Sequence, residues 1–70
     1  KKDYDKAIEI LTQALEYDDT NVDAMYFLGR CYQQKSDEDK AKEYYNKIIN
    51  DYSTSARAGE AKRRLRELGE

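Results

Sequence analysis

Apolar residues recur at intervals of three and four along most of the chain, and this spacing predicts α-helices rather than strands. The first helix is expected over residues 4–17 and the second over 22–34. The third is expected to open at Ser36 and to end near residue 52, and the fourth is expected over 56–68. The pattern therefore predicts an all-α protein built from antiparallel helix hairpins.

Polar residues stand where these helices should begin and end. Asp3 and Asn21 precede the first two apolar stripes, and both residue types cap helix N-termini well. Ser36, with Asp39 three residues later, approximates a capping box for the third helix. Gly69 is placed to stop the fourth helix.

The chain contains an internal repeat. The segment at positions 3–9 returns at positions 37–43, with five of the seven positions identical. The offset between the two copies matches the period of a helix-turn-helix solenoid, which is about 34 residues. We therefore expect the whole chain, 1–70, to form a single domain made of repeated hairpins.

Gly29 stands inside the apolar stripe of the second helix, between Met25 and Tyr32. A glycine costs about 1 kcal/mol relative to alanine in a helix interior. A close helix crossing, where a larger side chain would not fit, is the expected compensation.

Composition excludes several classes of function. Charged residues make up 40% of the chain, yet the net charge is only −2, which does not indicate a nucleic-acid partner. Histidine is absent and Cys31 is alone, so no metal site, cofactor site or catalytic pair is expected. The acidic run at 37–39 lacks the glycine turn of a calcium loop and is interpreted as helix capping. No apolar run is long enough to span a membrane.

The residues now described resemble the tetratricopeptide repeat family. Leu28-Gly29 followed by Tyr32 matches the first helix of its motif, and Ala41 followed by Tyr45 matches the second. The resemblance implies a right-handed α-solenoid fragment of four helices. In it, residues 22–52 form a complete repeat, residues 4–17 the second helix of a partial repeat, and residues 56–68 a terminal helix.

A second resemblance concerns the end of the chain. The segment from Tyr52 to Leu65 is similar to repeats of bacterial cell-envelope assembly proteins, which implies a bacterial protein of the cell envelope or cytoplasm. Aligning Ala61 with Ala24 makes this repeat longer than the first by three positions. That many extra residues are therefore expected in the turn at 53–55. The chain opens with Lys1 rather than Met, which favours a piece of a longer protein.

In the repeat family, the outer positions of each first helix line a concave groove that holds a peptide or a partner helix. The resemblance carries this role to Asp23, Tyr26, Phe27, Arg30, Gln33, Gln34, Arg63 and Arg64. Phe27 has two interpretations, since it is either a binding anchor or a residue packed on the neighbouring helix over Ala61 or Arg64. The arginines favour an acidic partner, because guanidinium groups pair bidentately with carboxylates.

Two other functions stay open beside the protein-binding module. The chain is alternatively a structural terminal segment of a longer repeat array that mediates oligomerisation. A weak homodimer through the first helix is expected, because Ile10 and Tyr17 lie off its main stripe. A nucleic-acid role rests only on the short basic cluster at 62–66 and is not expected.

Overall fold

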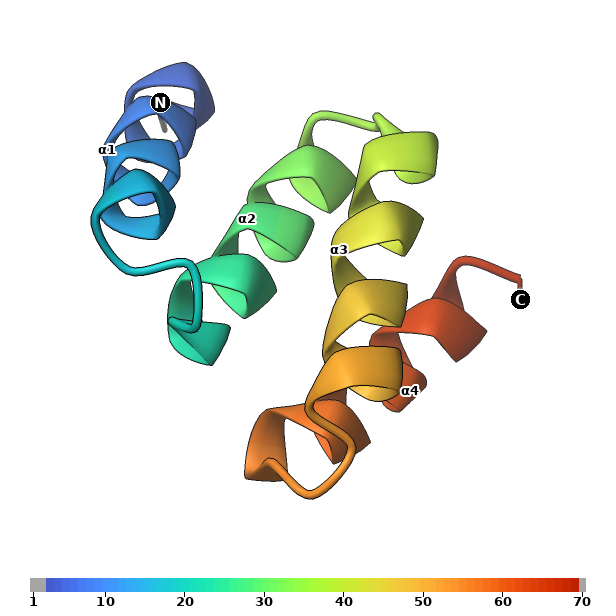
Figure 1. Ribbon diagram of the computed structural model, residues 1–70. Helices are drawn as coiled ribbons and strands as arrows, with labels where there is room; N and C mark the ends of the chain where they lie inside the picture. Colours follow the sequence, from blue (N-terminus) through green and yellow to red (C-terminus); the bar gives the residue numbers. More distant parts are fainter. Residues whose placement is uncertain (1–2, 70) are drawn as a thin grey trace.

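The computed structural model describes residues 3–69, and its secondary structure is helical (Figure 1). The helices are α1 (Tyr4–Tyr17), α2 (Val22–Gln34), α3 (Glu38–Asp51) and α4 (Ala56–Glu67). They follow one another in space in chain order, and each contacts the next. The predicted all-α fold of four helices is therefore confirmed. No helix in the described part of the chain is long and apolar enough to cross a membrane.

Each helix begins at a polar side chain that caps its free backbone N–H groups. The carboxylate of Asp3 accepts a hydrogen bond from the backbone N–H of Lys6 at 3.0 Å, and the Asn21 side chain accepts one from Ala24 at 3.1 Å. Asp37 caps α3 and Ser55 caps α4 in the same way. Asp37 follows Asp3, and Ser55 follows Asn21, by the same interval that separates the two copies of the repeated segment. The caps therefore keep the period of the sequence repeat.

Two details of the expected turns are wrong. Ser36 does not cap α3, since its φ is 67° and it forms the left-handed residue of the turn before Asp37. The turn at 53–55 holds no extra residues, because the starts of α2 and α4 are separated by the same interval as the starts of α1 and α3. Gly69, with a φ of 86°, does follow the end of α4 as predicted.

The core forms where α2, α3 and α4 meet. Met25, Tyr45 and Ile48 are its largest fully buried side chains, and Leu28 of α2 is also fully buried. Gly29 lies directly under the Tyr45 ring, because an ideal Cβ on Gly29 would stand 2.6 Å from Tyr45 Cε1. The close approach predicted at Gly29 is present, although a side chain rather than a helix backbone makes it.

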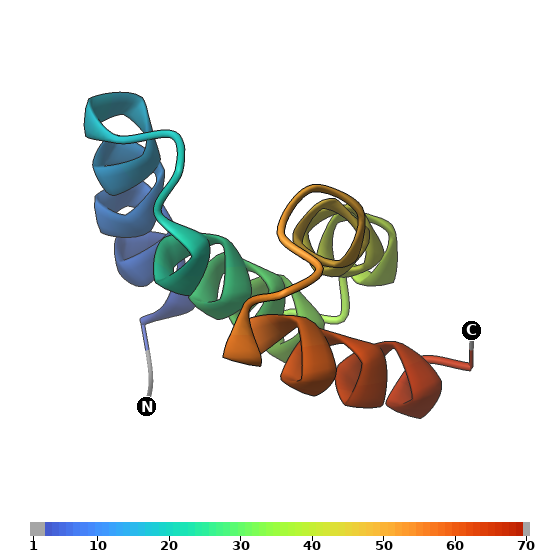
Figure 2. The same ribbon diagram turned by 60° about the horizontal axis from the view of Figure 1, so that its bottom comes forward.

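The first helix is attached to the rest of the fold through α2. Figure 2 shows α1 at one end of the molecule, and within the described residues it contacts neither α3 nor α4. No residue of α1 is fully buried. Ile10 is 55% exposed and Tyr17 is 95% exposed. One side of α1 therefore carries apolar surface that residues 3–69 leave exposed.

Candidate protein-binding groove between α1 and α2

A cavity of about 500 Å³ opens between α1 and α2. Its walls combine apolar side chains of α1 with a mixed set from α2. The residues that line it are Tyr4, Ala7, Ile10, Leu11, Phe27, Arg30, Cys31 and Gln34. Three of the eight predicted binding residues, Phe27, Arg30 and Gln34, lie together here. We call this cavity the α1–α2 groove.

Phe27 is held from one side and open on the other. Its ring meets that of Tyr26 edge to face, with centroids 5.5 Å apart, and the Arg57 guanidinium lies 5.1 Å from its centroid. The side chain is nevertheless 39% exposed and lines the groove. The neighbouring helix thus contacts Phe27 through Arg57. An aromatic ring fixed in this way loses little conformational entropy on binding.

Tyr26 lies in the core rather than on the groove surface. It is 4% exposed, and its hydroxyl accepts a hydrogen bond from Arg64 Nε at 3.2 Å. Arg64 also pairs with Glu67 through a contact of 3.2 Å. Both predicted site residues therefore join α2 to α4, and neither lines the α1–α2 groove.

The remaining predicted residues, Gln33, Asp23 and Arg63, also lie outside the α1–α2 groove. Gln33 accepts a hydrogen bond from the Tyr45 hydroxyl at 2.8 Å and donates one to Glu67 at 3.5 Å. Asp23 pairs with Arg57. Arg63 is exposed on α4, away from the groove. Of the predicted set, three residues therefore line the groove and four join α2 to α4, while Arg63 does neither.

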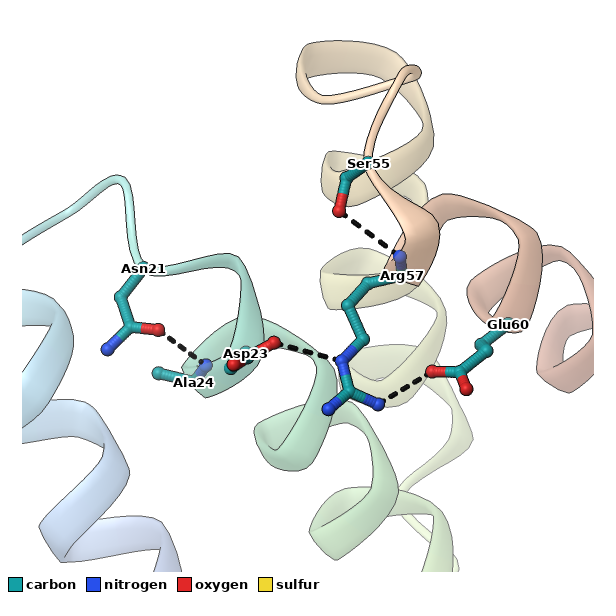
Figure 3. Close-up of polar contacts among 6 residues, drawn as sticks. All are labelled: Asn21, Asp23, Ala24, Ser55, Arg57 and Glu60. Carbon is teal, nitrogen blue, oxygen red and sulfur yellow. Dashed lines mark hydrogen bonds and ion pairs between the residues drawn. The ribbon is translucent and has the colours of Figure 1, made fainter.

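Arg57 is the residue that sequence reasoning missed. Its Nε lies 2.9 Å from the Asp23 carboxylate, and its Nη1 lies 2.7 Å from the Glu60 carboxylate (Figure 3). Its guanidinium also lies 4.9 Å from the Tyr26 ring centroid. Asp23 and Arg57 carry opposite charges and lie one repeat apart, so they occupy the same turn of neighbouring first helices. That spacing is the feature of the sequence that could have identified this ion pair.

Arg30 differs from the other groove residues in its electrostatics. Within residues 3–69 it forms no ion pair and no side-chain hydrogen bond. Its side chain is half-buried in a groove whose α1 wall is largely apolar. A guanidinium in that position attracts a carboxylate more strongly than one in open water would.

Cys31 has little nucleophilic character. Burial raises the pKa of its thiol, and the opposing effect of Arg30 is smaller. The thiol therefore stays protonated at neutral pH, and the thiolate is the reactive form. Its side chain is half-buried and lines the groove. No group of acidic and cysteine side chains suited to a metal ion occurs among the described residues.

Comparison with known proteins agrees with the repeat pattern. A family model described as tetratricopeptide repeat matches residues 1–65. The chain is also similar to the general transcriptional corepressor ssn6 of Schizosaccharomyces pombe, with 42% identity over 45 residues. That match covers 64% of this chain and 4% of the corepressor, so the chain spans a small part of its length. No solved structure matches the chain significantly.

Proposed function

Because the chain belongs to the tetratricopeptide repeat family, whose repeats mediate protein–protein interaction, we propose that it binds a protein segment in the α1–α2 groove. The observation that carries this proposal is the meeting of Phe27, Arg30 and Gln34 with the apolar wall of α1. Interfaces concentrate their binding energy in a few aromatic and arginine anchors surrounded by apolar contacts. The groove offers one anchor of each kind.

Phe27 supplies the apolar anchor in this proposal. Tyr26 and Arg57 contact its ring from the α2–α4 side, and the partly exposed ring lines the groove. Arg30 supplies the polar anchor, and an acidic group on the partner would give it a carboxylate that the described part of the chain does not provide. Gln34 provides an amide at the end of α2 that both donates and accepts hydrogen bonds.

The remaining predicted residues have supporting roles in this proposal. Tyr26, Gln33 and Arg64 fix α2 against α3 and α4. Asp23 fixes the start of α2 through Arg57. These contacts keep Phe27 and Arg30 on one rigid helix, which lowers the entropic cost of binding.

Selection from a peptide display library tests the proposal. The full chain is used as bait, and each selected peptide is measured by fluorescence anisotropy against Phe27→Ala and against Arg63→Gln. We expect Phe27→Ala to weaken binding at least tenfold and Arg63→Gln, which lies outside the groove, to change it less than twofold. Circular dichroism checks that both variants stay helical. Binders that tolerate Phe27→Ala would refute the groove as the site.

We do not propose a catalytic or nucleic-acid function. The family is a protein-interaction repeat without catalytic chemistry. The basic cluster at 62–66 is also partly engaged, because Arg64 is bonded to Tyr26 and Glu67. Nucleic-acid binding normally needs a broader basic surface with an element that enters a groove of the nucleic acid.

A second function is favoured by the uncovered side of α1. The exposed apolar side chains of Ile10 and Tyr17 are of the kind that self-associating helices bury. As the alternative function, the chain would be a structural segment that oligomerises through α1. This alternative makes a distinct prediction for the mass of the protein in solution, which is developed in the Discussion.

A further inference from the structure

We infer that the α1–α2 groove also binds a small amphipathic carboxylate, a free molecule with one acid group and an apolar tail. Such a ligand goes beyond the proposed function, because it is not part of a protein. The size of the groove, the order of polar and apolar groups along it and the charge of Arg30 all favour this class of ligand.

The size of the groove suits a small molecule. Its volume of about 500 Å³ lies within the usual range of small-molecule pockets, which is about 300–1,000 Å³. Eight residues line it, whereas a protein interface involves about 20–30 residues on each side. A protein segment bound here would therefore extend beyond the groove, but a small molecule would fit within it.

Two stripes of side chains form the walls of the groove. The stripe of α2 has the spacing i, i+3, i+4 and i+7 and consists of Phe27, Arg30, Cys31 and Gln34. The stripe of α1 has the spacing i, i+3, i+6 and i+7 and consists of Tyr4, Ala7, Ile10 and Leu11. Residues three and four apart are neighbours on a helix surface, so each stripe forms one continuous wall.

One end of the groove is polar. The Lys35 ammonium pairs with the Asp5 carboxylate, which places the start of α1 beside the end of α2. Tyr4 and Gln34 therefore lie toward the same end of the groove. They offer it a phenol hydroxyl and a side-chain amide, and both groups can donate hydrogen bonds to a carboxylate.

The opposite end of the groove is apolar. Because the two walls run in opposite directions, Leu11 of α1 lies toward the same end as Phe27 of α2, and Ile10 lies beside Leu11. Ile10 is 55% exposed and Phe27 is 39% exposed. An alkyl or aryl tail at this end would cover apolar surface that now meets water, which favours binding.

Arg30 supplies the charge that selects an acid. It lies one helical turn before Gln34, and within residues 3–69 it forms no ion pair and no side-chain hydrogen bond. Lys35, a second cation near the polar end, is already paired with Asp5. The half-buried guanidinium of Arg30 can therefore bind a carboxylate through two parallel N–H···O bonds.

The same arrangement disfavours other amphiphiles. A cationic head group would lie against Arg30, and repulsion between like charges is stronger in a partly buried site than in water. A neutral head group would gain no ion pair with the guanidinium. A doubly charged phosphate would bring one negative charge more than Arg30 balances, since Lys35 is engaged with Asp5.

Three ligands with the same alkyl chain and different head groups test the inference: octanoate, 1-octanol and octylammonium. Each is titrated at neutral pH into the full chain labelled with ¹⁵N, and amide chemical shifts report affinity and location. We expect octanoate to bind at least fivefold more tightly than octanol, and octylammonium to bind most weakly. The shifts should centre on residues 4–11 and 27–34. Each CH₂ group added to octanoate should tighten binding about threefold while the tail still fits.

Three variants of the chain locate the site. Arg30→Gln should lower the affinity for octanoate to that for octanol, because it removes the charge and keeps most of the side chain. Ala7→Phe, which fills the middle of the groove, should weaken both ligands at least tenfold. Arg63→Gln, a change on the exposed side of α4, should alter neither by more than twofold. Circular dichroism checks that each variant stays helical.

The outcomes separate this inference from the proposed function. Failure of octanoate to bind, octanol binding as tightly, or octanoate affinity that ignores Arg30→Gln would overturn the inference and leave protein binding to the display experiment. If display yields no peptide while octanoate binds as expected, the inference stands and the proposed function fails. Where display does yield a peptide that needs Phe27, octanoate should displace it, and simultaneous binding of both would overturn the groove as the carboxylate site.

Discussion

Replacing Gly29 with leucine should destabilise the fold, and the structure gives the reason. The Cβ of any side chain at this position would lie 2.6 Å from Tyr45 Cε1 and 2.9 Å from Cδ1. Contacts under 3.0 Å are not tolerated, so the Tyr45 ring must move. The ring is fully buried, and its hydroxyl donates a hydrogen bond to Gln33, so a shift disturbs both its packing and that bond.

The expected magnitude follows from two opposing effects. Removing a glycine from a helix interior stabilises by up to about 1 kcal/mol. Overpacking a filled core costs typically about 1–3 kcal/mol, and more where the obstructing group is fixed. We therefore expect Gly29→Leu to lower the free energy of unfolding by about 1–3 kcal/mol. In a domain of this size, a loss of about 1 kcal/mol lowers Tm by roughly 4–8 °C.

The same chain supplies a matched control. Gly59 lies in α4, and a Cβ built there meets nothing within 4 Å. Gly59→Ala should therefore raise Tm by the helix propensity alone, which is worth up to about 1 kcal/mol. Thermal melts followed by circular dichroism measure both variants. A Gly29→Leu protein that melts with the wild type, or a Gly59→Ala protein that melts below it, would refute the packing argument.

Three further predictions concern charge and association. Burial raises the pKa of Tyr45 to about 12, so the stability that the neutral Tyr45 phenol contributes is complete below pH 10 and is lost as pH rises from about 10 to 12. The urea midpoint of unfolding should therefore fall over that pH window. A midpoint that stays constant between pH 10 and 12 would contradict this prediction. Arg57→Gln should cost about 1 kcal/mol in urea unfolding, and the loss should shrink in high salt if its ion pairs dominate. Sedimentation should detect a weak dimer at hundreds of micromolar that Ile10→Glu abolishes; a strict monomer removes the self-association hypothesis.

The sequence predicted the helices well because two independent signals agreed on them. The apolar spacing located each helix, and cap-forming residues such as Asp3 and Asn21 marked where two of them begin. Ser36 misled the prediction because serine and aspartate both cap helices and stand side by side. The residue that takes the cap depends on the turn, and this turn places Ser36 in a left-handed conformation.

The binding surface was harder to predict, because a helical wheel assigns faces but not neighbours. The sequence placed Tyr26 among the outer positions of the second helix, where a partner would reach it. In the structure α4 crosses that flank and buries the ring, with Arg64 bonded to its hydroxyl. The crossing depends on how α3 turns into α4, and no residue within α2 specifies that turn.

The arginines show what additional signal the sequence did contain. Arg30, Arg63 and Arg64 were grouped as outer positions, yet only Arg64 has an acidic residue three positions later, and it is bonded to that residue. Arg57 has the same spacing to Glu60 and pairs with it. Arg30 is followed at that spacing by Gln33, so its charge is left without an acid on its own helix. The position of acids three residues downstream therefore separates an arginine that supports the fold from one that is available to a partner.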